Sequence, residues 1–255
     1  MEIVKPRDRG LSASIIIPCH NEEMNVVLCY PRIPPMGVSQ EFIFVDDGST
    51  DKTKDKITEL TARDKRVKLI SYPGRKGKGH AVRTGIAAAK GDVLIILDAD
   101  MSVMPEDLPD FFSLINVGDA DFVNGTRMVY PVKQSMNALH ILGNKIFSRL
   151  FTWLLGQRIT DTLCGTKAFL KSDYDKINML SENDPWGDFD LLIGAATLGL
   201  RIVEMPVRYQ KRLFGYSKMR PFKHGLILFS RVIWGFKELK VKRLSGKTAC
   251  QKMKR

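Results

Sequence analysis

The sequence predicts an α/β protein built around a mostly parallel sheet with helices on both faces. Four segments in the first 100 residues are continuous apolar runs, which is typical of strands that are buried on both sides. Spacers of helix length separate these runs, so each strand is expected to lie parallel to its neighbours after a crossover. The chain has 255 residues, of which 44% are hydrophobic, and this is enough for one such domain with a full core.

The first four strands are predicted at residues 14–18, 42–45, 67–70 and 93–97. Proline ends the first strand, and the acidic residues after it suit the positive N-terminal end of a helix. The second strand ends in Asp46-Asp47-Gly48-Ser49, and a helix is expected from about Asp51. Gly77-Lys78-Gly79 precedes a further helix at 81–89, which leads into the most apolar strand.

The second half of the chain has a less regular pattern. Further strands are expected at 121–125, 169–170 and 202–207, and residues 137–156 form an amphipathic helical stretch. We divide the chain into a polar lead-in at 1–11, one α/β domain at 12–225, and an apolar segment with a basic tail at 226–255.

Polar residues gather where three of the predicted strands end. These residues are His20-Asn21-Glu22, Asp46-Asp47 and the pair Asp98 and Asp100. Ligands of open parallel sheets bind at the carboxyl ends of the strands, so one pocket is expected to collect all three groups. Asp98-Ala99-Asp100 can share one divalent cation, and a metal or solvent must offset the cost of placing these acids beside a buried strand. The alternative is a surface turn that carries two aspartates.

Two other motifs fit known metal or phosphate loops poorly. Residues 46–51 lack the spaced ligands and final glutamate of an EF-hand. Helix capping by Ser49, Thr50 or Asp51 is an alternative role for this motif, and it is compatible with ligand binding. Residues 74–79 have the glycine spacing of a phosphate loop, but His80 stands where the loop lysine belongs. A flexible basic loop near a diphosphate is the remaining interpretation.

The formal net charge of +12 predicts an anionic partner. Residues 237–255 carry eight Lys or Arg and a single acid, so the tail suits an anionic membrane, or else serves only solubility. The apolar segment 225–236 is about 12 residues long and contains Arg231, so it can lie on a membrane but not cross it. No recognised nucleic-acid-binding module accompanies the charge.

The expected location is the cytoplasm, with peripheral attachment to the inner face of the membrane. The four cysteines show neither CxxC nor metal spacing, and the N-terminus lacks the apolar core of a signal peptide. The apolar segments leave room for a membrane protein as a partner.

Seven motifs in a fixed order resemble the family-two glycosyltransferases, and within them the dolichyl-phosphate mannose synthase-like group. They lie at residues 17–22, 45–51, 77–79, 97–100, 124–127, 161–169 and 212–218, and the resemblance covers about residues 12–225. The resemblance implies a single GT-A fold, which is a nucleotide-binding α/β sandwich with the acceptor site in its second half.

The resemblance also implies a role for each matched residue. Base and ribose would be held by Pro18, His20, Glu22, Val45 and Asp47. Sugar and metal, Mg²⁺ or Mn²⁺, would be held by Asp98, Ala99 and Asp100, with Ser102 as a further ligand. The phosphates of donor and acceptor would be held by Arg127, Arg212 and Lys218.

The expected reaction is the inverting transfer of a hexose from GDP-mannose or a UDP-sugar to a polyprenyl phosphate at the membrane surface. A lipid phosphate is already ionised and needs no general base. The alternative acceptor is a glycan hydroxyl in cell-surface polysaccharide synthesis, which needs a carboxylate base, either Asp188 or Asp190. Those two acids also suit the N-terminal end of a helix. A non-catalytic nucleotide-binding protein is disfavoured by the intact pair of Asp98 and Asp100.

Overall fold

The computed structural model describes residues 8–129, 138–177, 187–215, 229–230, 232–237 and 239. The predicted site residue Lys218 and most of segment 226–255 lie outside the described residues. The domain division stays a prediction, although Arg9, in the predicted lead-in, already donates from Nε to the Asn116 carbonyl oxygen at 3.0 Å.

The described residues form a seven-stranded, mostly parallel sheet in the order β3-β2-β1-β4-β6-β5-β7. The strands are β1 (Ala13–Cys19), β2 (Gln40–Asp47), β3 (Val67–Tyr72), β4 (Val93–Ile96), β5 (Phe122–Thr126), β6 (Lys167–Leu170) and β7 (Ile202–Pro206). β6 alone runs antiparallel to its neighbours β4 and β5, while the other pairs are parallel. The predicted fold class is confirmed.

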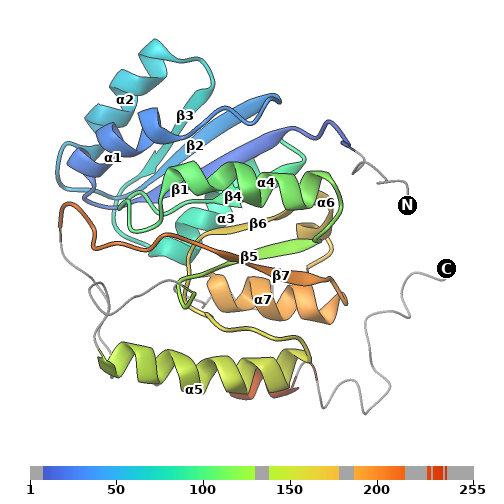
Figure 1. The fold of residues 1–255 in the computed structure, drawn as a ribbon. Helices are drawn as coiled ribbons and strands as arrows, with labels where there is room; N and C mark the ends of the chain where they lie inside the picture. The colour runs from blue at the N-terminus through green and yellow to red at the C-terminus, as the bar shows by residue number, and fades with distance from the viewer. Residues whose placement is uncertain are drawn as a thin grey trace.

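Helices cover both faces of the sheet (Figure 1). One face carries α1 (Glu23–Cys29), α2 (Thr53–Arg63) and α4 (Leu108–Asn116), and the other carries α3 (Lys78–Ala88) and α7 (Asp188–Thr197). Shorter elements are the 3₁₀ turns η1 (Tyr30–Arg32) and η2 (Pro105–Asp107) and the single-turn helix α6 (Lys171–Tyr174).

The central strands β1, β2 and β4 are apolar at successive positions because both of their faces are buried, whereas the edge strand β3 carries Lys68 and is only partly buried. On β1, Ile15 and Ile17 pack into the core cluster under α1, α2 and α4, whereas Ile16 packs into the cluster under α3 and α7. Successive side chains of a strand point to opposite faces, so a strand covered on one side only would have alternated apolar and polar residues.

A third layer lies outside α7, where α5 (Ala138–Leu155) packs with the segment around residues 232–237 (Figure 1). The rings of Phe151 on α5 and Phe189 on α7 have centroids 5.2 Å apart. Val232 joins the same cluster. Gly235 allows close packing, because a Cβ there would lie 2.8 Å from Cδ2 of Leu154. None of the helices in the described ranges combines the length and hydropathy that crossing a bilayer requires.

Candidate active site

The carboxyl ends of β1, β2 and β4 meet at one edge of the sheet. β1 runs parallel to both other strands, with Cys19 opposite Asp46 on β2. The polar residues after each strand therefore lie close together, where ligands of parallel sheets bind. Within the described ranges, the non-glycine residues with positive φ are Asn21 and Met101, at 55° and 61°, and they directly follow two of the predicted site residues. Such backbone is uncommon and concentrates at functional loops.

Asp47, which the resemblance assigns to the base or ribose, has a buried carboxylate that anchors a neighbouring loop. One carboxylate oxygen accepts hydrogen bonds from the Tyr72 hydroxyl at 3.0 Å and the Lys76 amide at 2.7 Å. The other oxygen accepts from the Gly77 amide at 2.8 Å. His20 lies beside this loop, with Nδ1 2.8 Å from the Asp47 carbonyl oxygen. Asp47 thus ties the end of β2 to the start of α3, and its contact with a nucleotide stays a prediction.

The other residues assigned to the base and sugar lie at the same edge. Pro18 and Val45 are opposite each other on β1 and β2. The Val45 side chain is fully buried in the core, so the backbone is what this residue offers a ligand. Ala99 is 3% exposed between the two aspartates. Glu22 precedes α1 and accepts a hydrogen bond from Asn25 Nδ2 at 2.6 Å.

Asp98 forms an ion pair with Lys78, the first residue of α3. The Lys78 Nζ lies 2.6 Å from Oδ1 of Asp98. Burial by itself would raise the pKa of the Asp98 carboxyl, but Lys78, with Lys167 and Arg212 further away, holds this pKa below its ordinary value. Asp98 is therefore ionised at neutral pH, as a metal ligand must be.

Asp100 contacts a segment that lies far from it in the sequence. Its Oδ2 accepts a hydrogen bond from Arg212 Nη2 at 2.5 Å, and its Oδ1 accepts from the Ser102 amide at 2.9 Å. Arg212 Nη1 also lies 3.8 Å from Oε1 of Glu22. The Ser102 carbonyl oxygen accepts from the Gln210 amide at 3.0 Å, which holds residues 209–212 beside the segment that follows β4. The structure thus brings together Glu22, Asp100, Ser102 and Arg212.

The oxygen ligands after β4 fit a hard divalent cation whose coordination is completed by the substrate. Among the described residues, no group of three or more His, Cys, Asp or Glu side chains is arranged to hold a metal ion. Mg²⁺ is usually held by one or two carboxylates together with substrate phosphates, and Mn²⁺ also favours oxygen ligands. Two aspartates at one strand end, with a nearby serine, match this mode of binding. Lys78 and Arg212 supply the compensating positive charge at Asp98 and Asp100.

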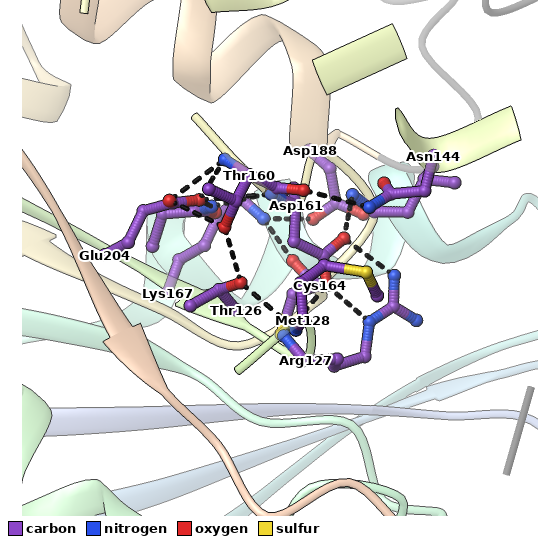
Figure 2. Close-up of polar contacts among 12 residues, drawn as sticks. Thr126, Arg127, Met128, Asn144, Thr160, Asp161, Cys164, Lys167, Asp188 and Glu204 are labelled. Atoms are coloured by element: carbon purple, nitrogen blue, oxygen red, sulfur yellow. Dashed lines mark hydrogen bonds and ion pairs between the residues drawn. The ribbon is translucent and has the colours of Figure 1, made fainter. Parts of the chain in front are cut away.

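Arg127, assigned to phosphate binding, is held by a buried carboxylate (Figure 2). Its Nε and Nη2 donate to the two oxygens of Asp161 at 2.6 Å and 2.8 Å, and its backbone amide donates to the same group at 3.1 Å. The guanidinium also lies over the Tyr209 ring, 5.1 Å from its centroid. Glu204 on β7 holds the adjoining loop by accepting from the Asp161 amide at 3.1 Å. A phosphate-binding role for Arg127 stays a prediction, and it would have to coexist with these contacts.

The two acids proposed as a general base lie in different surroundings. Asp188 contacts Lys167 Nζ at 3.1 Å and lies 4.0 Å from Lys78 Nζ. Asp190 is fully buried two residues further along α7, which is about 200° around the helix axis. The carboxylate that faces the Asp98 side of the site is therefore that of Asp188, and a role as base stays a prediction for both.

Three contributors to the site, Lys78, Asp161 and Lys167, are absent from the set that the sequence predicts. Each belongs to a motif that the sequence does show, at 77–79 and 161–169. Their partners lie 20 or more residues away along the chain, at Asp98, Arg127 and Asp188. Each of the three is recognisable in the sequence as a charged residue within a motif, but only the fold shows with which residue it forms an ion pair.

A mostly parallel sheet with an acidic pair after its central strand is the arrangement expected of a GT-A glycosyltransferase, and comparison with known proteins gives the family. Residues 14–177 match the family model described as Glycosyl transferase family 2, so the chain belongs to this family.

Two relatives match this chain over most of both sequences. The polyprenol monophosphomannose synthase of Mycolicibacterium smegmatis is 30% identical over 242 residues, covering 92% of this chain and 89% of the relative. The dolichyl-phosphate hexose transferase of Haloferax volcanii is 28% identical over 220 residues, covering 86% of this chain and 92% of the relative. The match to glycosyltransferase AglD of Haloferax volcanii is 24% identical and covers 80% of this chain but only 34% of that longer protein.

Solved structures support the fold. Glucosyl-3-phosphoglycerate synthase from Mycobacterium tuberculosis, in complex with phosphoglyceric acid, superposes with a TM-score of 0.64 at 21% sequence identity, over 89% of this chain and 80% of that one. The same enzyme in complex with Mn²⁺, uridine diphosphate and glucosyl-3-phosphoglycerate superposes with a TM-score of 0.61. At this identity the likeness shows a shared fold.

Proposed function

We propose that this chain transfers a hexose from a nucleoside-diphosphate sugar to a polyprenyl phosphate, with inversion at the anomeric carbon. The observation that carries this proposal is the pair Asp98 and Asp100 at the carboxyl end of β4, facing Lys78 and Arg212. Support for the acceptor comes from relatives of nearly the same length whose names include polyprenol or dolichyl phosphate.

The donor would lie along the carboxyl ends of β1, β2 and β4. Base and ribose would contact Pro18, His20, Glu22, Val45 and Asp47, and the sugar would lie beside Ala99. Asp98 and Asp100, with Ser102, would hold Mg²⁺ or Mn²⁺. When bound, the cation would neutralise the diphosphate charge that grows as the sugar leaves.

In the proposed reaction, the side chains of the site stabilise the charge of the leaving group and hold the reactants in position. An acceptor phosphate oxygen attacks the anomeric carbon, and the bond from that carbon to the donor's diphosphate oxygen breaks with its electron pair leaving on the nucleoside diphosphate. Arg212 and Lys78 already lie beside the two aspartates, so they are placed to stabilise the leaving diphosphate. Since a phosphate monoester acceptor is ionised at neutral pH, the step requires no general base. Arg127 and Lys218 would then help to hold acceptor phosphate.

A membrane surface fits the outer layer of the molecule, which bears a face that we call the apolar-basic face. It consists of the exposed apolar residues Leu142, Ile146, Trp153, Phe229, Ile233 and Phe236, with Lys145, Arg149 and Lys237 among them. Neither α5 nor residues 229–237 contain Asp or Glu.

Geometry and charge together favour a lipid surface with anionic headgroups as the partner of this face. The Trp153 and Phe236 rings stack with centroids 5.7 Å apart, which joins the two segments into one surface. Aromatic and aliphatic side chains flanked by basic ones are typical of segments that lie in the plane of an anionic membrane. Peripheral attachment would bring the site to an acceptor whose chain is embedded in the bilayer.

The proposed reaction is tested by supplying acceptors of both kinds with a panel of nucleotide sugars. Purified protein with Mn²⁺ would be incubated with short-chain polyprenyl phosphate or with a glycan acceptor, and products identified by mass spectrometry. We expect a hexosyl-phosphate lipid from the wild type and none from Asp100→Ala. Transfer to the glycan alone would favour the hydroxyl acceptor instead, and Asp188→Asn and Asp190→Asn would then identify the base.

A further inference from the structure

Lys167 is a fully buried lysine between the central sheet and the N-terminal end of α7. It begins β6 and has 0% exposure. Its Nζ donates to the Cys164 carbonyl oxygen and lies 3.1 Å from Oδ1 of Asp188 (Figure 2). A buried ammonium group is costly unless it is paired and hydrogen-bonded, so this arrangement is specific. Because solvent does not reach Lys167, the residue acts on a substrate only through its neighbours.

Asp188 connects this lysine to the site. Its second oxygen, Oδ2, lies 4.0 Å from Nζ of Lys78, which in turn lies 2.6 Å from Asp98. The N-terminal ends of α3 and α7 approach each other closely here: a Cβ on Gly187 would lie 3.4 Å from the Cα of Gly79. Lys78 is a cation at the N-terminal end of α3, where the helix dipole disfavours positive charge. The carboxylates of Asp98 and Asp188 are what keep it there.

Lys167 also holds the loop that covers this ion pair. Its bond to the Cys164 carbonyl oxygen fixes the residue before Gly165. A Cβ on Gly165 would lie 2.3 Å from both Oδ2 of Asp98 and Nζ of Lys78, so the backbone of the loop packs directly against the two charged groups. Two routes from Lys167, through Asp188 and through this loop, therefore converge on the same ion pair.

We propose that Lys167 and Asp188 form a buried positioning pair that holds Lys78 and Asp98 in the geometry the donor diphosphate and metal require. The inference rests on the proposed function, because it assigns Asp98 to the donor site. It makes Asp188 a positioning residue and not the base for a hydroxyl acceptor. Both of its carboxylate oxygens face ammonium groups, on Lys167 and Lys78.

Affinity for nucleotide, measured without any acceptor, tests the pair. Isothermal titration calorimetry would use Mn²⁺ with UDP and Mn²⁺ with GDP on Lys167→Met, Asp188→Asn and the double variant. Residues that position a metal ligand typically change affinity about 10–100-fold. We expect each single variant to lose about tenfold or more, and the double variant to lose no more than the larger single loss, because both residues act on the same ion pair of Lys78 and Asp98. In transfer assays the donor KM should rise while the shape of the kcat against pH profile is kept.

Lys171→Met is the matched control. Lys171 follows the far end of β6 and likewise donates to a backbone carbonyl oxygen, that of Ala89. It should leave nucleotide affinity within about twofold of wild type, a change that is small beside the expected tenfold loss. Far-UV circular dichroism and the Tm identify variants that fail to fold. If Lys167→Met is one of them, Gly165→Ala tests the loop route, with Gly143→Ala as control because a Cβ at Gly143 meets nothing within 4 Å.

The outcomes separate this inference from the proposed function. Nucleotide affinity that survives in folded Lys167→Met and Asp188→Asn overturns the pair while leaving the donor site intact. Unchanged affinity in Asp188→Asn, with a lost acidic limb of the kcat profile, would instead make Asp188 a base. A wild-type protein that binds neither nucleotide refutes the donor site itself, and the positioning pair with it.

Discussion

Removing the Asp161 carboxylate should cost far more stability than removing an exposed acid from an ion pair of similar length. Asp161 is fully buried and accepts three hydrogen bonds from Arg127, at 2.6, 2.8 and 3.1 Å. Asp161→Asn leaves that guanidinium buried without its counter-charge. Breaking a buried ion pair in this way costs about 3–5 kcal/mol, which for a chain of this size lowers the Tm by roughly 6–20 °C.

The matched control is Glu106→Gln. Its carboxylate lies 2.7 Å from Arg32 Nε, but the two side chains are 34% and 38% exposed. An exposed pair contributes about 0.2–1 kcal/mol, so this variant should change the free energy of unfolding by no more than that. Urea unfolding monitored by circular dichroism measures both variants.

The pH dependence of the same variant follows from the direction of the pKa shift. Burial by itself would raise the pKa of the Asp161 carboxyl, but Arg127 holds it below its ordinary value. A carboxyl with a lowered folded pKa stabilises the fold above its unfolded value of about 3.9, and this contribution is lost as pH falls through the folded value. The stability gap between wild type and Asp161→Asn should be constant from about pH 5 to 8 and shrink below about pH 4.

Two results would refute this reasoning. One is an Asp161→Asn protein within about 1 kcal/mol of wild type, which is the range of an exposed pair. The other is strict additivity in a double-mutant cycle with Arg127→Met, because residues that share an ion pair should couple.

Three further predictions concern the core, the loops that follow β2 and β3, and the outer layer. Burial raises the pKa of the Cys29 thiol to about 12 and that of Cys164 to about 11, so iodoacetamide should label neither in the native protein at pH 8, as read by mass spectrometry. Gly48 has φ of 63°, and a Cβ there would lie 2.5 Å from the Gly74 carbonyl carbon. Gly48→Ala should therefore lose about 2–4 kcal/mol of stability, from backbone strain and overlap together, as measured by urea unfolding. Trp153→Ser should weaken binding to anionic vesicles about tenfold in co-sedimentation, since it removes an aromatic group from the apolar-basic face.

The Gly48 and Trp153 predictions each have a control variant. Gly37→Ala shares the positive φ, at 71°, but its Cβ would meet nothing within 4 Å, so an equal loss in both variants would contradict the overlap at Gly48. Met24→Ser removes an exposed apolar side chain from α1, outside the apolar-basic face, and equal vesicle binding by Met24→Ser and Trp153→Ser would contradict the role of that face. Rapid labelling of native Cys29 would show that its surroundings open readily.

The first half of the fold follows from the sequence because its central strands β1, β2 and β4 are buried on both faces and all four strands are separated by helices. The structure has strands at 13–19, 40–47, 67–72 and 93–96, each overlapping the predicted run. The second half depends on contacts between distant segments. No apolar pattern shows that β6 pairs antiparallel with β4, and Gly125 on β5 packs so closely on Cys164 that a Cβ would lie 2.6 Å from its Sγ.

Helix α4 is also recognisable in the sequence. α4 is absent from the predicted elements, yet Leu108, Phe111, Phe112 and Ile115 repeat at helical spacing and are all buried. A proline follows the first of them, at a position that a helix start accepts. The helix is therefore visible in the pattern, unlike the pairing of the strands beside it.

The candidate site, like the fold, is predictable from the sequence only in part. Asp98 and Asp100 are recognisable because they directly follow the most apolar strand, and the fold then brings Glu22 and Arg212 to them. The sequence suggests a phosphate as the partner of Arg127, but it does not show the ion pair that Arg127 forms with Asp161. That ion pair depends on the loop that carries Asp161, and this loop is held by Glu204, which lies 43 residues after Asp161 in the chain.

The anomeric configuration of the lipid product tests the central claim most directly. NMR of the glycolipid made from an α-linked nucleotide sugar and short-chain polyprenyl phosphate gives both the linkage and the configuration in one sample. Our account predicts a single hexose joined through a phosphodiester to the lipid, with the β configuration. A product that keeps the α configuration, or a sugar carried on a hydroxyl group, would contradict it.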